Sequence, residues 1–273
     1  YYVSTTGSDL NPGTQSQPLK TIQRAADLAN AGATVYVQPG TYPEHVSTKK
    51  GGTGESARII FKANGLVTMK GFHIYHPYVT IDGFDITGHQ GGYRGHITVV
   101  STNSSKGDYC KIINNTIRDG LPQTQGIIFE RINGRISNNC VIKNNLLTNL
   151  RYTFLGIDGD NHLIEDNILE KLNSSDYIYL FGHNHVFRHN IFRQGNSIEG
   201  TGNHPDWLQT FGDNCGVSSG HLFEENYIEG LDPGVQLGQI NSGGVGSSQC
   251  PGLSNDIKDI TFRRNVFANI GHN

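Results

Sequence analysis

The sequence predicts an all-β chain folded as a right-handed parallel β-helix (a β-solenoid), with one short helix that caps its N-terminal end. Two observations predict this fold: a composition rich in turn-forming residues and a short segment that recurs around a fixed asparagine. The chain has 273 residues, 35 of them glycine, and only 35% of the residues are hydrophobic. This profile is typical of all-β and solenoid chains, because turns need glycine and helices do not.

The recurring segment is seven residues long and has asparagine at its fifth position, as in Leu163–Leu169. Successive copies lie 30, 22, 23, 36 and 39 residues apart. A shortest period of 22 residues is too short for a propeller blade, and the LxxLxL pattern of leucine-rich repeats is absent. One coil of three short strands fits this period. The recurring asparagines are Asn115, Asn145, Asn167, Asn190, Asn226 and Asn265.

Asparagine tolerates the left-handed backbone of a sharp turn, so we expect it between two strands of each coil. We also expect these side chains to form a hydrogen-bonded ladder along the helix axis. The N-terminal part fits the same fold. Apolar residues at helical spacing over 21–29, followed by Gly32, predict a short helix that closes the open end of the solenoid. We therefore predict a single domain over 1–273, with a cap over about 1–45 and coils over about 46–273.

Charge and hydropathy exclude two classes of partner. The net charge is −3 and the sequence contains no basic block, so we expect no nucleic acid partner, since phosphate binding needs clustered lysine and arginine. No apolar run approaches the roughly 20 residues of a membrane-spanning helix, so we expect no membrane span.

The opening of the chain resembles the pectate-lyase-like superfamily of right-handed parallel β-helix proteins. The resemblance rests on Tyr2-Val3-Ser4, Gly7-Ser8-Asp9, Asn11-Pro12-Gly13-Thr14 and Thr21-Ile22-Gln23, and on the coils over 79–267. It covers nearly the whole chain and implies an extracellular protein, secreted or at the cell surface, with a polysaccharide substrate. The superfamily includes lyases, hydrolases, epimerases and phage tailspikes, so the resemblance is more specific for fold than for activity.

In this superfamily the asparagine ladder lies between the second and third strands of a coil, which identifies the first strands here. The period of two predicts that Leu155, Ile178, Leu208 and Leu237 point inward. An outward row of aromatic and amide side chains suits the faces and hydroxyls of sugar rings, although a long loop folded over them would also explain it. The residues predicted to point outward and bind substrate are Phe154, Tyr177, Tyr179, Trp207, Gln209 and Gln236.

Long insertions accompany these strands, over 193–205 and 241–256, and long excursions from a solenoid are usually functional. The segment from Arg193 to Asp206 is the best candidate for a site-bearing loop, with Arg193 as a substrate-binding residue. Asp206 and Asp176 occupy matching positions in adjacent coils, where strands lie about 4.8 Å apart. Two such carboxylates would either hold a cation, for which Ca²⁺ is the candidate, or share a proton. The alternative is that each aspartate only caps a turn. The loop adds Glu199 and His204.

Two enzymatic mechanisms fit the predicted catalytic residues Asp206, His204, Asp176 and Glu199. In a polysaccharide lyase, Ca²⁺ held by Asp176 and Asp206 neutralises a uronate while a base removes the neighbouring proton; His204, Tyr177 and Tyr179 are candidate bases. In a glycoside hydrolase of tailspike or polygalacturonase type, the paired carboxylates act as acid and base or nucleophile. A non-catalytic carbohydrate-binding module is the third alternative.

The sequence departs from its relatives in the site motifs. It has neither the compact aspartate cluster with a lysine base of the lyases that its N-terminus resembles, nor the Asn-Thr-Asp, Asp-Asp and Gly-His-Gly motifs of polygalacturonases. Asp158, Asp160 and Asp213 lie at the other end of the first strands. We still favour a lyase that cleaves a uronate-containing polysaccharide by β-elimination.

Histidines and cysteines also recur by coil. His162, His185 and His221 share one column with Cys110 and Cys140. Because stacked side chains point the same way and cannot surround an ion, we interpret the histidines as a stack and not as a metal site. An even number of cysteines in an extracellular protein makes disulfides reasonable. Cys110 with Cys140 is one possible pair, and Cys215 with Cys250 is the favoured one.

Overall fold

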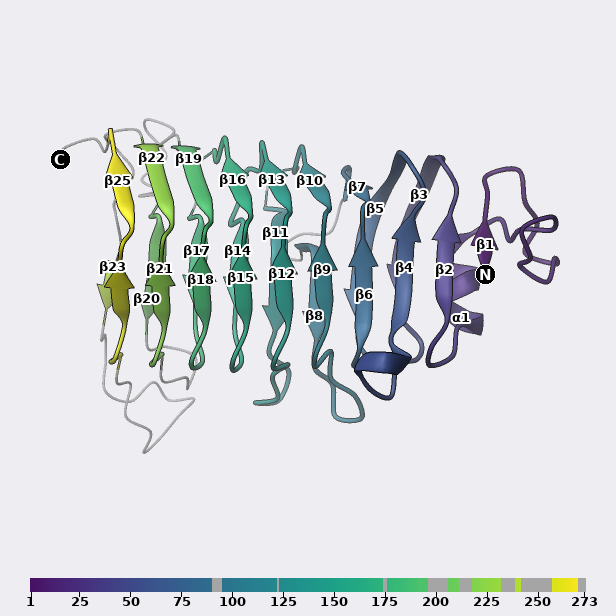
Figure 1. Ribbon diagram of the computed structural model, residues 1–273, viewed down its shortest axis with the longest axis horizontal. Helices are drawn as coiled ribbons and strands as arrows, with labels where there is room; N and C mark the ends of the chain where they lie inside the picture. The colour runs from purple at the N-terminus through teal and green to yellow at the C-terminus, as the bar shows by residue number, and fades with distance from the viewer. Residues whose placement is uncertain are drawn as a thin grey trace.

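The computed structural model describes residues 1–89, 95–121, 123–173, 176–195, 206–211, 218–231, 239–241 and 257–269. The described strands form two long sheets in which neighbouring strands are parallel and come from successive coils. Figure 1 shows the coils stacked along the long axis, with the two ends of the chain at opposite ends of the molecule. The predicted parallel β-helix is confirmed.

Each coil runs through three faces. The first face is a ten-stranded sheet, here called sheet A, with strands β1 (Tyr2–Val3), β2 (Thr34–Val37), β4 (Ile59–Ala63), β6 (Val79–Asp82), β9 (Lys111–Ile113), β12 (Val141–Lys143), β15 (Leu163–Glu165), β18 (Val186–Arg188), β21 (Leu222–Glu224) and β24 (Thr261–Arg263). The second face is formed by β7 (Asp85–Ile86), β10 (Thr116–Arg118), β13 (Leu146–Thr148), β16 (Ile168–Glu170), β19 (Ile191–Gly195), β22 (Tyr227–Leu231) and β25 (Val266–Ala268).

The third face is formed by β8 (Gly95–Val100), β11 (Gln125–Glu130), β14 (Leu155–Ile157), β17 (Ile178–Leu180), β20 (Leu208–Phe211) and β23 (Gln239–Asn241). The long strands β3 (Gly40–Ser47) and β5 (Val67–Ile74) pair with each other, and β5 pairs with both β7 and β8. The second and third faces are therefore one continuous fifteen-stranded sheet that bends around the coil.

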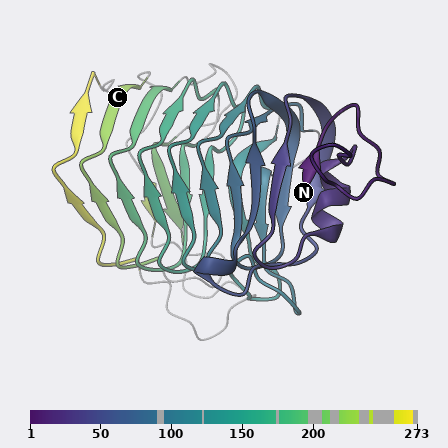
Figure 2. The ribbon, with the colours of Figure 1, turned by 45° about the vertical axis from the view of Figure 1, so that its right-hand side comes forward.

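The predicted capping helix is α1 (Ile22–Leu28), which lies at the N-terminal end of the solenoid in Figures 1 and 2. Thr21 caps it, because its hydroxyl accepts the backbone N–H of Arg24 at 3.1 Å. Ile22, Ala25 and Ala26 are buried against the first coil. A short 3₁₀ helix, η1 (Glu55–Ala57), is the other helical element described. Among the described residues, no helix has the length and apolar character that crossing a membrane requires.

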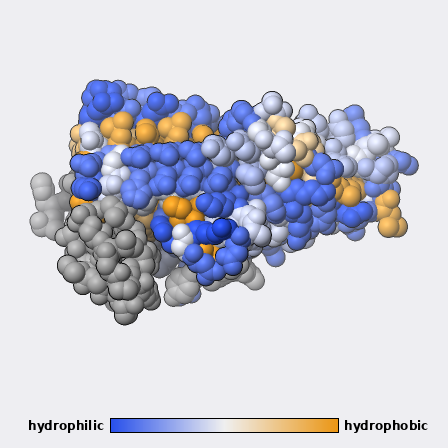
Figure 3. Space-filling model, turned by 90° about the horizontal axis from the view of Figure 1, so that it is seen from below, coloured by the Kyte–Doolittle hydropathy of each residue, from blue (hydrophilic) through white to orange (hydrophobic). Residues whose placement is uncertain are grey.

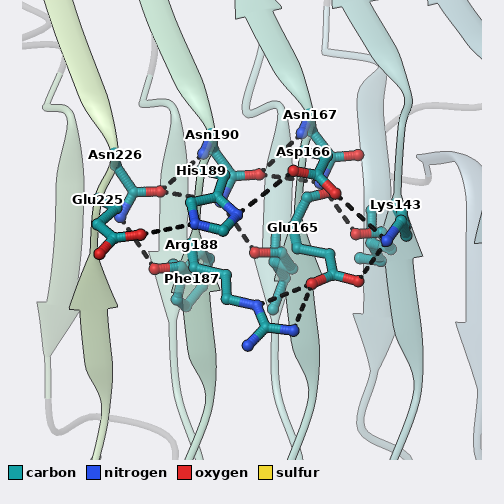
Figure 4. Close-up of polar contacts among 12 residues, drawn as sticks. Lys143, Glu165, Asp166, Asn167, Phe187, Arg188, His189, Asn190, Glu225 and Asn226 are labelled. Atoms are coloured by element: carbon teal, nitrogen blue, oxygen red, sulfur yellow. Dashed lines mark hydrogen bonds and ion pairs between the residues drawn. The ribbon is translucent and has the colours of Figure 1, made fainter.

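The asparagine ladder lies between sheet A and the second face. These two faces hold the strands expected to be second and third in each coil, and the third face holds the first, so the ladder lies where it was expected. The side-chain amide of Asn167 donates to Asn190 Oδ1 at 3.0 Å, and the amide of Asn190 donates to Asn226 Oδ1 at 3.0 Å (Figure 4). The backbone N–H of each ladder asparagine from Asn115 to Asn226 also donates to the next Oδ1, as Asn167 does at 3.0 Å. These side chains are almost fully buried, so the ladder satisfies backbone groups that would otherwise be orphaned in the interior.

The expected reason for this asparagine is wrong in one respect. The left-handed backbone belongs to the residue before the ladder position, with φ of 57° at Asp166, 55° at His189 and 54° at Glu225. Asparagine, aspartate, histidine, glutamate and arginine all occur there. The recurring asparagine is therefore kept by its hydrogen bonds and not by its backbone conformation.

The interior is one apolar cluster that extends along the described part of the solenoid. Its aromatic rings stack from coil to coil: the ring centroids of Phe187 and Phe223 are 4.5 Å apart, and those of Phe223 and Phe262 are 5.0 Å apart. Seen from below, the described surface is mostly hydrophilic with smaller hydrophobic patches (Figure 3). This separation of inside from outside follows from the alternation of side chains along each strand.

Candidate functional site

The outer surface of β8, β11, β14, β17 and β20, here called the candidate face, carries part of the predicted outward row. Tyr179 pairs in register with Gly156 on one side and with Gln209 on the other. Tyr179 and Gln209 are half-buried, whereas the flanking Ile178, Leu180 and Leu208 are buried. The predicted outward direction of Tyr179 and Gln209 is therefore confirmed.

The predicted outward direction of Phe154, Tyr177 and Trp207 is wrong. Their exposed fractions are 0%, 0% and 2%. Each lies immediately before a strand begins, at the corner where the chain enters the third face, and the alternation of a straight strand does not extend through that corner. The rings fill the interior, with Phe192 between Tyr177 and Trp207 at centroid distances of 5.8 and 5.7 Å. Buried in this way, they are core residues and cannot contact a polymer on the surface.

Asp176 and Asp206 are neighbours in adjacent coils, as expected. The backbone N–H of Asp206 donates to Asp176 Oδ1 at 2.7 Å. Both residues are buried, with exposed fractions of 5% and 0%. The Asp176 carboxylate thus accepts a backbone N–H of the next coil. This agrees with the alternative expectation that the aspartate caps a turn. Catalytic and metal-binding roles for these two residues stay predictions, because Glu199 and His204 of the same predicted site lie outside the described residues.

Arg193, which is also predicted to bind substrate, is not on the candidate face. Arg193 lies in β19 on the second face, where its Nε and Nη2 donate to Glu170 Oε2 at 2.9 and 2.7 Å. It begins the predicted loop in sequence but points away from the third face. Gln236 and Asp213 lie outside the described residues.

The described part of the candidate face carries a charged group that sequence reasoning missed. Arg131 follows β11, and Asp158 follows β14 in the next coil. Nε and Nη2 of Arg131 donate to the two carboxylate oxygens of Asp158 at 2.7 and 2.6 Å. The exposed fraction is 24% for the Arg131 side chain and 11% for that of Asp158. This fork geometry fixes the guanidinium at the edge of the face.

Asp160 and His183 continue this group at the turn toward sheet A. His183 Nδ1 lies 2.8 Å from Asp160 Oδ1, and both side chains are partly exposed. The hydrogen bonds that Arg131 donates to Asp158, together with the charges of Asp158 and Asp160, raise the pKa of Arg131 above its usual value. We call these four residues the Arg131 cluster. It combines a fixed cation with an imidazole whose second ring nitrogen is directed by a carboxylate, which is an arrangement suited to proton transfer next to an anion.

The sequence did contain a signal for the Arg131 cluster. Asp158 and Asp160 were expected at this end of the strands. Arg131 and His183 occupy the corresponding ends of the preceding and following coils. Opposite charges at matching positions of adjacent coils predict ion pairs. Because the coils differ in length, however, the matching positions cannot be identified from the sequence alone.

The histidine column is a stack, as expected. The rings of His162 and His185 are 4.9 Å apart and those of His185 and His221 are 4.9 Å apart, with interplanar angles of 9° and 15°. Nδ1 of each ring accepts a backbone N–H of the preceding coil, from Cys140, His162 and His185 at 3.0, 3.1 and 3.2 Å. Nε2 of His162 and His185 donates to a carbonyl oxygen. The stacked imidazoles are therefore neutral and act as hydrogen-bond partners for backbone groups in the interior.

Cys110 and Cys140 are buried free thiols, so the possible disulfide between them is wrong. The backbone N–H of Cys110 donates to Cys140 Sγ at 3.2 Å, and this sulfur lies 3.2 Å from the carbonyl oxygen of Gly107. Burial raises the pKa of Cys140 well above its usual value, which makes it an inert thiol. The favoured pair, Cys215 with Cys250, lies outside the described residues.

Within the described ranges, no group of three or more histidine, cysteine, aspartate or glutamate side chains is placed to hold a metal ion. In the Asp176–Asp206 pair, one oxygen of the Asp176 carboxylate already accepts the backbone N–H of Asp206. The Ca²⁺ expected at Asp176 and Asp206 stays a prediction.

A model of the Pel9A-like right-handed β-helix region matches residues 1–161. The chain belongs to this family. The match includes Arg131, Asp158 and Asp160 and ends before His183 and Asp176. It is consistent with the two sheets and the cap described above.

Two relatives match short parts of the chain. The uncharacterized protein YwoF of Bacillus subtilis (strain 168) is 46% identical over 52 residues, which are 19% of this chain and 11% of YwoF. Pectate lyase PEL9 of Emericella nidulans (strain FGSC A4) is 41% identical over 61 residues, which are 22% of this chain and 15% of the lyase. The matched segments thus span less than a sixth of either relative.

Solved structures with the same fold include two lyases and a phage tailspike protein. A rhamnogalacturonan lyase aligns with a TM-score of 0.60 at 16% identity, over 85% of this chain and 68% of the lyase. Pectate lyase Pel9A aligns with a TM-score of 0.56 at 15% identity, over 89% of this chain and 79% of the lyase. A tailspike protein of Escherichia coli bacteriophage HK620 aligns with a TM-score of 0.58 at 13% identity, over 94% and 57%. At these identities the likeness shows the fold alone.

Proposed function

We propose that this protein is an extracellular polysaccharide lyase that cleaves a uronate-containing polymer by β-elimination. The observation that carries the proposal is the Arg131 cluster, in which a fixed guanidinium at the edge of the candidate face interacts electrostatically with Asp160, the carboxylate partner of His183. Membership of the Pel9A-like family supports the substrate class, and so does the pectate lyase among the relatives.

In the proposed reaction the polymer lies along the candidate face, with Tyr179 and Gln209 beside it. Arg131 binds the uronate carboxylate through Nη1, which takes no part in the two bonds to Asp158. This ion pair stabilises the carbanion character that develops next to the carboxylate. Asp160 accepts the Nδ1 proton of His183, so Nε2 of His183 takes the proton from C5. The electron pair forms the C4–C5 double bond, the C4–O bond breaks, and the leaving oxygen takes a proton from water.

The sequence-predicted site of Asp176, Asp206, His204 and Glu199, with Ca²⁺ at the two aspartates, is the competing location for the same reaction. Both locations predict an unsaturated product, so variants must separate them. The assay follows the ultraviolet absorbance of that product on pectate, alginate and glycosaminoglycans, with added calcium and with EDTA.

The variants are Arg131→Ala and His183→Gln. Loss of a general base or of a positioned charge costs about 10²–10⁴-fold in rate, so we expect a decrease of this size in each. Arg188→Ala and His189→Gln are matched controls, because these side chains are also half-exposed and paired with carboxylates but lie at sheet A. Both controls are expected to keep full activity.

If Arg131→Ala and His183→Gln keep wild-type activity and a folded Asp206→Asn variant loses it, the active site lies at Asp176 and Asp206 instead. A requirement for calcium would then locate the ion there. Absence of ultraviolet absorbance on every uronate polymer would reject the lyase.

A glycoside hydrolase is the second candidate, favoured by the adjacent carboxylates of Asp176 and Asp206 and by the tailspike-like fold. It would release reducing ends without ultraviolet absorbance, because hydrolysis adds water and forms no double bond. Binding of a polymer without any product would instead identify a carbohydrate-binding module.

A further inference from the structure

A pocket lies on the outer surface of sheet A at its N-terminal end, on a different sheet from the candidate face. Its volume is about 550 Å³, within the range of small-molecule sites. The floor comes from β1, β2 and the end of β4, and the wall comes from the loop that follows β1. Residues from both parts line it: Tyr2, Thr6, Gln15, Tyr36, Gln38 and Asn64.

Two tyrosine rings form an aromatic platform in this pocket. Tyr2 and Tyr36 are register partners on adjacent parallel strands, and their ring centroids are 5.3 Å apart at an interplanar angle of 26°. Tyr36 is 37% exposed, although it belongs to a strand whose flanking valines are fully buried. An exposed aromatic plane next to polar groups suits a ligand with an apolar face and hydroxyl edges, as a sugar ring has.

The polar groups around the platform are amides and hydroxyls. Asn64 Nδ2 donates to Gln38 Oε1 at 3.3 Å, which orients both amides at the edge of the rings. In the wall, the hydroxyls of Ser4 and Thr6 are 3.0 Å apart. Such groups donate and accept hydrogen bonds in the pattern that sugar hydroxyls need.

Of the described residues that line the pocket, none is charged. The next residue along the same outward row, Lys62, is already paired with Asp82 at 3.3 Å. A uronate carboxylate placed on the tyrosine platform would therefore lose water without gaining a positive partner, which is unfavourable. A neutral saccharide carries no such penalty.

We propose that this pocket binds a neutral saccharide unit, such as a neutral side chain or stretch of a polysaccharide, as a second site separate from the candidate face. This site does not depend on the proposed lyase activity. It would anchor the protein on a polymer whose charged backbone is recognised elsewhere.

The test is calorimetric titration of the whole chain with neutral oligosaccharides of galactose, arabinose and xylose and with oligogalacturonate. We expect at least one neutral probe to bind, and to shift the NMR signals of the Gln15, Gln38 and Asn64 side-chain amides. Tyr36→Ala should weaken that binding about tenfold, because aromatic stacking plus the lost contact area is worth about 1.4 kcal/mol. Tyr36→Phe, which keeps the ring, should bind within about twofold of wild type.

Tyr109→Ala is the matched control. Tyr109 is 42% exposed and stacks on Tyr78 at 4.7 Å, but it lies outside the pocket. It should leave neutral binding unchanged. The proposal is overturned if no neutral probe binds, if Tyr36→Ala and Tyr109→Ala bind like wild type, or if oligogalacturonate shifts the pocket amides more than any neutral probe. None of these results depends on the ultraviolet assay, so failure of this site and failure of the lyase proposal are distinguishable.

Discussion

Phe154, Tyr177 and Trp207 occupy the residue immediately before a strand, and Tyr179 and Gln209 lie within one. This difference of position decides which side chains reach the surface. Inside a strand the backbone alternates, so the sequence pattern predicts direction correctly. At a corner the chain turns and the alternation of side chains is interrupted. The large rings there point inward because burying their apolar surface is favourable. Sequence patterns therefore predict direction within strands and fail at their ends.

The buried position of Trp207 leads to a prediction. It is the only tryptophan in the chain, so the fluorescence of the protein reports its environment. We expect acrylamide and iodide to quench this fluorescence weakly in the native state and strongly in urea. Trp207→Ala should lower the free energy of unfolding by about 3–5 kcal/mol, because it removes a large ring from a packed interior. Trp207 contacts Phe192, Phe223 and Phe267, so several core rings lose a neighbour.

The control for this prediction is Tyr179→Ala on the candidate face, where a half-buried ring leaves no closed cavity. It should lower the free energy of unfolding by clearly less than Trp207→Ala does. Strong native-state quenching of Trp207, or equal destabilisation by both variants, would contradict its placement in the core.

At the scale of elements, the turns between faces are built as ladders of three kinds. Asparagine amides form one, neutral histidines form the second, and ion pairs form the third. Figure 4 shows Glu165 between Lys143 and Arg188, and His189 between Asp166 and Glu225. Each ladder repeats because stacked coils place equivalent residues about 4.8 Å apart. The sequence predicted the asparagine and histidine ladders from their recurrence, whereas the ion-pair ladder alternates in sign and shows no recurring residue.

The histidine ladder predicts loss of stability in mild acid. Burial is the main cause that lowers the pKa of His221 to about 4 and that of His185 well below its usual value. Burial also lowers the pKa of His96 to about 4 and that of His45 to about 3. In the unfolded chain these groups titrate near 6.5. Between pH 6.5 and about 4 the unfolded state therefore binds more protons, and the free energy of unfolding falls as the pH is lowered.

The expected slope is about 1.4 kcal/mol per pH unit for each histidine that stays neutral in the folded state. Urea unfolding at several pH values between 7 and about 4.5 measures it, because this range lies mostly above the carboxylate titrations. His221→Gln should reduce this slope by about 1.4 kcal/mol per pH unit, because it removes one histidine whose pKa burial lowers. A slope of zero over this range would show that the interior histidines become protonated without unfolding.

The described part of the molecule is a one-dimensional stack in which each strand pairs with strands of the adjacent coils. The repeat made this architecture predictable, together with its cap and single apolar interior. The Arg131 cluster was not predictable in the same way, because its residues come from three successive coils of unequal length. Arg131, Asp158 and His183 lie at corresponding ends of successive coils, and this correspondence can be recognised only when the register of those coils is known. The long insertions carry no repeat at all, so their sequence gives no register for Glu199 or His204.

A stack of this kind should open from its ends, which hydrogen exchange can measure. An interior strand such as β15 is bonded to a coil on each side, whereas β24, in the last described coil, is bonded only to β21. Residues Thr261, Phe262 and Arg263 of β24 are also exposed. We expect their amides to exchange about a hundredfold faster than those of Ile164 and Phe187, a difference of about 3 kcal/mol in opening free energy.

Asn167→Ala tests whether the coils are coupled only to their neighbours. Asn167 accepts from Asn145 and donates to Ile142 and Asn190, so its loss leaves buried groups in two adjacent coils unsatisfied. Exchange should accelerate in β12, β15 and β18 and stay unchanged in the distant strands β2 and β4, because no described contact links those strands to the altered coil directly. Equal acceleration over all strands would mean that the solenoid opens as one cooperative unit, and the nearest-neighbour account of its stability would then be wrong.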